Sequence, residues 1–171
     1  MEQNDATPIE AHVPPELAAQ LIRGEITLAD FTGLSRAALY SIAEYGYRMF
    51  SSGKLEEART IYRGLVAADP LDSVFHCHLA ATLHRLGEHD EALNEYTSAL
   101  RFNVANIDAL VGRGEILLQR GQLAGAFADL TSAIKLDPQG KLTSTVRAGA
   151  ILNALKNAAS APAPSPPTAR S

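Results

Sequence analysis

Apolar and small residues recur along the middle of the chain with a period of 34 residues. In 39–72 a large apolar residue, a glycine and a second large apolar residue follow at helical spacing, then an alanine, a tyrosine and a proline. The same order returns, with few changes, in 73–106 and 107–140. Residues three and four apart share one face of a helix, so each segment predicts two amphipathic helices joined by a short turn.

Small residues recur with this 34-residue spacing at three positions of the repeat, and each position has a steric explanation. The three sets are Gly46, Ala80 and Gly114; Gly53, Gly87 and Gly121; and Ala58, Ala92 and Ala126. The first and last sets let the two helices of a pair approach closely, and the middle set suits a left-handed turn after the first helix. The period and the order of positions resemble the tetratricopeptide repeat. We therefore expect an all-α fold, three tandem repeats that form a short right-handed α-solenoid.

Two positions depart from the repeat pattern. Val104 stands where Pro70 and Pro138 stop the other two repeats, so the second repeat is expected to run on with less of a break. Arg113 stands at a normally apolar position, and we expect it to lay its methylene groups along the surface.

Both ends of the chain differ from the repeats. We expect a disordered N-terminus over 1–13, a helical arm or cap over 14–38, a capping helix over 141–157 and a disordered Ala/Pro-rich tail over 158–171. Leu17, Leu21 and Ile22 form an apolar strip on the arm, which either caps the solenoid or pairs with a second copy in a homodimer.

Charge and cysteine content exclude several classes of function. Residues 1–34 hold six acids and one base, whereas 35–157 hold 13 of each sign, so no basic surface for nucleic acid is expected. The single cysteine, Cys77, gives no sign of a disulfide framework. The polar, acidic start is unlike a secretory signal, and no apolar run is long enough to cross a bilayer, so we expect a cytoplasmic protein without direct membrane insertion.

No residue pattern predicts an enzyme, a metal site or a cofactor. His76 and His78 diverge by about 200° on a helix, which prevents joint chelation. Cys77 has no base or orienting acid at a diagnostic spacing.

The first helices of stacked tetratricopeptide repeats line a concave groove, into which the second, fifth, ninth and twelfth positions point in this repeat family. Here those positions predict a client-binding groove that is apolar and partly aromatic. We expect its lining to be Tyr40, Ala43, Tyr47, Phe50, Val74, Cys77, Ala81, His84, Val111, Glu115 and Leu118, with Asp108 alongside. None of these is Lys, Arg or Asn, which argues against a clamp for a C-terminal carboxylate. The alternative is that these side chains only pack between neighbouring helices.

The arm followed by three repeats resembles the class II chaperones of bacterial type III secretion. The resemblance is densest in 21–28 (LIRGEITL), 39–43 (LYSIA) and 52–62 (SGKLEEARTIY), and it covers about residues 17–140. It implies a chaperone that holds an extended, proline-containing segment of a secreted translocator protein near Tyr40, Tyr47 and Phe50 before export. It also implies homodimerisation through the arm. A general tetratricopeptide adaptor in another assembly is the alternative.

Overall fold

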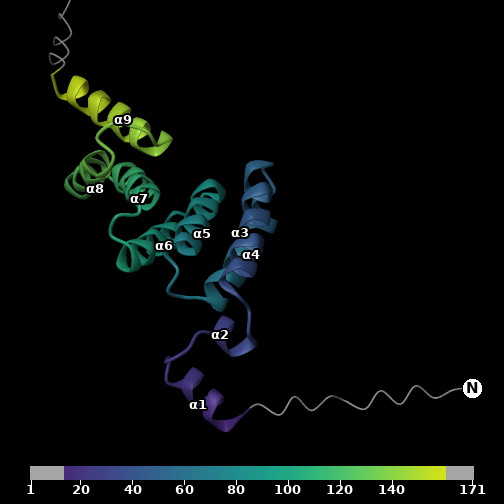
Figure 1. Ribbon diagram of the computed structural model, residues 1–171. Coiled ribbons are helices and arrows are strands. Elements are labelled where there is room, and N and C mark those ends of the chain that lie inside the picture. The colour runs from purple at the N-terminus through teal and green to yellow at the C-terminus, as the bar shows by residue number, and fades with distance from the viewer. Residues whose placement is uncertain (1–13, 161–171) are drawn as a thin grey trace, which may run out of the picture.

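The computed structural model describes residues 14–160, and over that range the chain is all-helical (Figure 1). The helices are α1 (Pro15–Ile22), α2 (Leu28–Thr32), α3 (Arg36–Ser51), α4 (Leu55–Ala68), α5 (Ser73–Leu86), α6 (His89–Phe102), α7 (Ile107–Gln119), α8 (Leu123–Leu136) and α9 (Thr143–Ser160). Helices α3 to α8 form three consecutive antiparallel pairs, which confirms the predicted solenoid of tetratricopeptide type. No helix in this range is both long and apolar enough to cross a membrane.

Polar side chains and glycines set the helix ends. Ser35, Asp72 and Asn106 cap α3, α5 and α7, accepting hydrogen bonds from the main-chain N–H groups of the first turn. Gly53, Gly87 and Gly121 follow the first helix of each pair with φ of 80°, 83° and 71°. These left-handed residues confirm the predicted turns.

Small residues allow the paired helices to touch. Ala58, Ala92 and Ala126 are fully buried. A Cβ atom at Gly46 would lie 3.0 Å from the Tyr62 ring, and one at Gly114 would lie 3.0 Å from Leu130. The predicted close approach is therefore confirmed in the first and third pairs.

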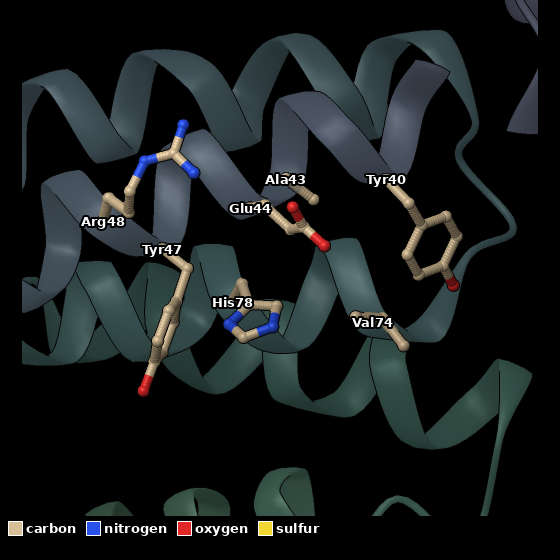
Figure 2. A pocket seen from close by; sticks show the side chains of 7 residues that line it. All are labelled: Tyr40, Ala43, Glu44, Tyr47, Arg48, Val74 and His78. Atoms are coloured by element: carbon tan, nitrogen blue, oxygen red, sulfur yellow. The ribbon is translucent and has the colours of Figure 1, made fainter. Parts of the chain in front are cut away.

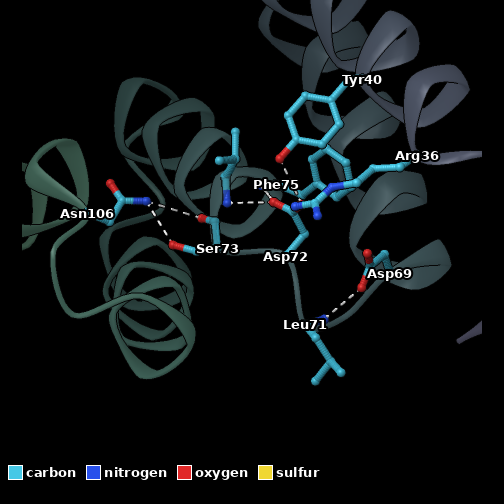
Figure 3. Close-up of polar contacts among 9 residues, drawn as sticks. Arg36, Tyr40, Asp69, Leu71, Asp72, Ser73, Phe75 and Asn106 are labelled. Carbon is cyan, nitrogen blue, oxygen red and sulfur yellow. Dashed lines mark hydrogen bonds and ion pairs between the residues drawn. The ribbon is translucent and has the colours of Figure 1, made fainter. Parts of the chain in front are cut away.

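The expectation for Val104 is wrong, because α6 ends at Phe102 without a proline. The side chain of Asn103 accepts a hydrogen bond from the Ala105 N–H at 3.0 Å. Asp69 makes the same turn after α4, accepting from the Leu71 N–H at 3.2 Å (Figure 3). An Asx-turn residue stops the helix as effectively as the proline does.

The expectation for Arg113 is also wrong. Its guanidinium does not lie on the surface but reaches across to α8, where it forms an ion pair with Asp129. Both side chains are largely shielded from solvent.

The two ends of the solenoid are covered differently. α2 begins with a reciprocal cap between Thr27 and Asp30, and it packs against α4 with Ala29 buried. α1 contacts α2, carries no buried residue and lies at the end of the array opposite α9 (Figure 1).

At the far end α9 packs on α7 and α8 and buries Ala148 and Leu152. It continues through Ser160, so residues 158–160 of the predicted tail are helical, as expected for an alanine-rich extension. The rest of that tail and the predicted disordered N-terminus, 161–171 and 1–13, lie outside the described residues.

Candidate functional site

The inner helices α3 and α5 line an open cavity of ≈490 Å³ between them (Figure 2). Tyr40 and Tyr47 stand at its two ends on α3, and His78 projects from α5 between them. The cavity is lined by Tyr40, Ala43, Glu44, Tyr47, Arg48, Val74 and His78.

This cavity continues along the inner face of the solenoid. Tyr47, Val74 and His78 also line a second cavity of ≈570 Å³, which extends to Asn106 and to Arg147 on α9. Phe50, Ala81, Tyr96 and Arg147 are shared in turn with a third cavity of ≈300 Å³. Shared walls make the three cavities one groove that runs from α3 to α9.

Aromatic rings form the middle of the groove. The Tyr47 ring lies 6.4 Å from the Phe50 ring and 6.0 Å from the His78 ring, measured between centroids. Arg85 holds Phe50 in place, with its guanidinium 4.6 Å above the ring centre and donating to the Phe50 carbonyl at 2.9 Å. Tyr47 is 54% exposed, so it presents its ring to the groove rather than to the core.

Tyr40 is held at the first end of the groove by a network around Asp72. Its hydroxyl donates to Asp72 at 2.9 Å, and the Arg36 guanidinium lies 3.4 Å from the same carboxylate oxygen (Figure 3). The other Asp72 oxygen caps α5, accepting from the Val74 N–H at 2.8 Å. The carboxylate therefore fixes the Tyr40 ring relative to α5.

The groove floor is uncharged at neutral pH. Burial lowers the pKa of His78, whose ring stacks on Tyr62 with centroids 5.1 Å apart. Burial also raises the pKa of the Cys77 thiol to about 12, so the thiolate that a nucleophile requires is not formed. This part of the groove suits apolar contact rather than acid–base chemistry.

The end of the groove at α9 is polar. Arg147 Nε lies 2.6 Å from a carboxylate oxygen of Glu115, and Ser144 donates to Asp108. Burial raises the pKa of Glu115 and the Arg147 charge opposes that rise. α9 therefore supplies a wall of the groove as well as a cap.

The structure brings most of the predicted groove positions together. Of the eleven, nine line the three cavities, although Ala43 and Cys77 are buried at the floor. Val111 is fully buried, so its assignment to the groove surface is wrong. Leu118 is half-buried and lines none of the three cavities. That the nine lining residues bind a client stays a prediction.

Sequence reasoning missed several lining residues. Glu44 and His78 follow the fifth position directly and are 34 residues apart, a repeat signal that could have revealed them. Arg48, Asn106 and Arg147 also line the groove, from positions outside the expected set. Arg147 comes from α9 and Tyr96 from an outer helix, which the inner-helix assignment did not consider.

Comparison with protein families gives two matches. Residues 15–108 match the bacterial transcriptional activator domain, and residues 79–141 match a tetratricopeptide repeat.

Low calcium response locus protein H of Yersinia pseudotuberculosis serotype I is 29% identical over 138 residues, which cover 79% of this chain and 82% of that protein. The Yersinia enterocolitica type III secretion chaperone SycD, in complex with a peptide of the translocator YopD, has a TM-score of 0.64. It is 25% identical and covers 74% of this chain and 98% of SycD. SycD in an alternative dimer has a TM-score of 0.67 at 27% identity, with 75% and 98% covered. The predicted resemblance to translocator chaperones is confirmed.

Proposed function

This chain belongs to the bacterial transcriptional activator domain family, built here from tetratricopeptide repeats, and we propose that it is a chaperone of secreted translocator proteins. It holds an extended segment of a translocator in the groove between α3 and α9 until type III export. The observation that carries the proposal is the continuous aromatic groove, in a fold that holds a translocator peptide in SycD.

The shape and chemistry of the groove suit an extended peptide. Alternate side chains of such a segment point to opposite sides, so the aromatic middle of the groove accepts one set while polar groups along the groove reach the main chain. Tyr47 and Phe50 provide the apolar surface, and the ion pair of Glu115 with Arg147 provides polar groups at the far end. Binding there would cover apolar translocator segments that otherwise aggregate or enter membranes.

The remaining features fit a binding protein rather than an enzyme. SycD, to which the chain is similar, is a chaperone by name. The apolar strip on α1, in which Ile22 is exposed and Leu17 and Leu21 are half-buried, supports a homodimer, and SycD also forms dimers. A translocator must be held where it is synthesised, which assigns this chain to the cytoplasm.

The family match favours a second candidate, an adaptor in an assembly that regulates transcription. In that case the groove would bind a regulatory protein instead of a translocator. The chaperone function has the stronger support, because the similarity to SycD covers 74% of this chain and 98% of SycD.

Co-expression with the translocators of its own organism tests the proposal. A soluble complex is expected, and limited proteolysis should leave a protected translocator segment bound to the chaperone. That segment, synthesised as the client peptide, is then titrated against the purified chain. If no translocator forms a complex while a regulatory protein does, the adaptor function replaces the chaperone function.

A further inference from the structure

Tyr62 and Tyr96 occupy the same repeat position, 34 residues apart, but use their hydroxyl groups differently. The Tyr62 hydroxyl donates to the Ala43 carbonyl at 3.1 Å, and the residue is fully buried. Tyr96 is 4% exposed, yet no hydrogen bond to its hydroxyl is found among residues 14–160. The internal bond of the first repeat is therefore not repeated in the second.

The difference follows from the residue that covers each ring. His78 stacks on the Tyr62 ring at an interplanar angle of 11°. One repeat later the equivalent residue is Gly112, where a Cβ atom would lie 2.2 Å from Tyr96 Cζ and 2.3 Å from its hydroxyl oxygen. The Tyr96 phenol thus occupies space that any side chain at 112 would take.

The Tyr96 hydroxyl reaches the groove. Tyr96 lines both the second and the third cavity. Its hydroxyl oxygen is not among the fully enclosed, unbonded polar atoms, which are found on His89, Thr131 and Thr145. Since a shielded polar group without a partner is destabilising, a native protein satisfies it with water or with a ligand.

We propose that the Tyr96 hydroxyl donates a hydrogen bond to a main-chain carbonyl of the extended client segment, where the second and third cavities meet. This inference rests on the proposed function. An extended peptide presents a carbonyl at every residue, so a fixed donor in the wall finds an acceptor whatever the client sequence. Glu115 and Arg147 neutralise each other beside this point, so no net charge there selects a charged client side chain.

The test is Tyr96→Phe, which keeps the ring over Gly112 and removes only the hydroxyl. Client-peptide affinity should fall about threefold to tenfold, the effect of losing one neutral hydrogen bond. The melting temperature should stay within error or rise. Tyr62→Phe is the matched control: it removes an internal bond, so it should lower the melting temperature and leave client affinity unchanged.

Peptides with single alanine substitutions separate a main-chain from a side-chain acceptor. If the acceptor is a main-chain carbonyl, Tyr96→Phe should bind each peptide more weakly than the wild type does, and by the same factor for every peptide. A peptide on which the loss disappears would identify a side-chain acceptor and overturn the assignment. If the wild type binds the client peptide and Tyr96→Phe binds it equally well, the role of Tyr96 is refuted and the chaperone function stands. If the wild type binds no translocator, both fail.

Discussion

Arg113 on α7 and Asp129 on α8 are joined by two parallel hydrogen bonds, from Nε to Oδ2 at 2.7 Å and from Nη2 to Oδ1 at 2.8 Å. Their side chains are 25% and 10% exposed. The residue 34 before Asp129 is Glu95, which pairs instead with His76, at 2.6 Å. The same outer-helix position thus carries an acid in the second and third repeats, and the acid pairs with His76 in the second and with Arg113 in the third.

Breaking the pair of Arg113 and Asp129 should destabilise the third repeat. Asp129→Ala leaves the guanidinium partly buried without its partner, a change that costs about 3–5 kcal/mol for a fully buried pair and less for this partly exposed one. The double variant Arg113→Leu with Asp129→Ile places the residue types of Leu79 and Ile61 there and should recover most of the loss. Urea unfolding of both variants measures this; a double variant as unstable as Asp129→Ala would contradict it.

His76 should make the stability of the second repeat depend on pH. Its Nδ1 lies 2.6 Å from Glu95 and its Nε2 lies 2.9 Å from the Pro70 carbonyl, both of them acceptors, so the protonated ring suits the site. Burial acts to lower the pKa of His76, but these two bonds and the negative charges of Glu95 and Asp72 together outweigh it, so the net pKa is raised. The stabilisation is therefore fully present below the unfolded pKa of about 6.5 and is lost as pH rises through the higher folded pKa.

The measurement is the difference in unfolding free energy between the wild type and His76→Phe, from pH 5.5 to 8.5. The difference cancels the contributions of His78 and His84, whose pKa values are lowered by burial. The advantage of the wild type should shrink as pH rises. An advantage that grows with pH would mean that His76 is held neutral.

The repeat architecture could be predicted because steric requirements recur in the sequence. Gly114 must be small for the helix pair to close, and Gly121 must adopt a left-handed turn, so both leave a periodic signal. The pair of Arg113 and Asp129 leaves none, because its members are 16 residues apart and meet only after α7 and α8 have packed.

The groove could be predicted only to the level of its inner helices. The fifth repeat position is buried in all three repeats: Ala43 and Cys77 form the floor of the groove, and Val111 lies beneath it in the core. Tyr96 contributes to the groove only because Gly112 leaves room above its ring. Such a relation between two helices is not a property of either helix pattern alone.

The arm should control dimerisation through its apolar strip, and above all through Ile22, the exposed residue of the three. Ile22 is 85% exposed in the single chain, so Ile22→Asp removes nothing from the core but charges the proposed interface. The mass from light scattering should shift from dimer towards monomer at the same concentration, with unchanged helicity. Val104→Asp, at a residue 78% exposed in the turn between α6 and α7, is the control and should leave the mass unchanged. A dimer that persists in Ile22→Asp would exclude α1 as the interface.

Tyr47 should bind the client without supporting the fold. Because its ring is 54% exposed and lines two adjoining cavities, Tyr47→Ala opens no void in the core. Loss of an aromatic anchor in a binding groove commonly costs about 2 kcal/mol or more, roughly a thirtyfold loss of affinity. Leu79→Ala is the contrasting variant: the side chain is 3% exposed, and its truncation should cost on the order of 2–5 kcal/mol of stability.

Phe50 is expected to behave between these two extremes. It lines the groove, but it also packs against the core and carries the Arg85 guanidinium over its ring. Phe50→Ala should therefore weaken client-peptide binding and lower the melting temperature together, each by less than the extreme variant does. Thermal melts and peptide titrations on Tyr47→Ala, Phe50→Ala and Leu79→Ala distinguish groove residues from core residues.

If Tyr47→Ala melts at as low a temperature as Leu79→Ala, the Tyr47 ring belongs to the core. If it melts and binds like the wild type, the client lies elsewhere, on the convex face or the arm.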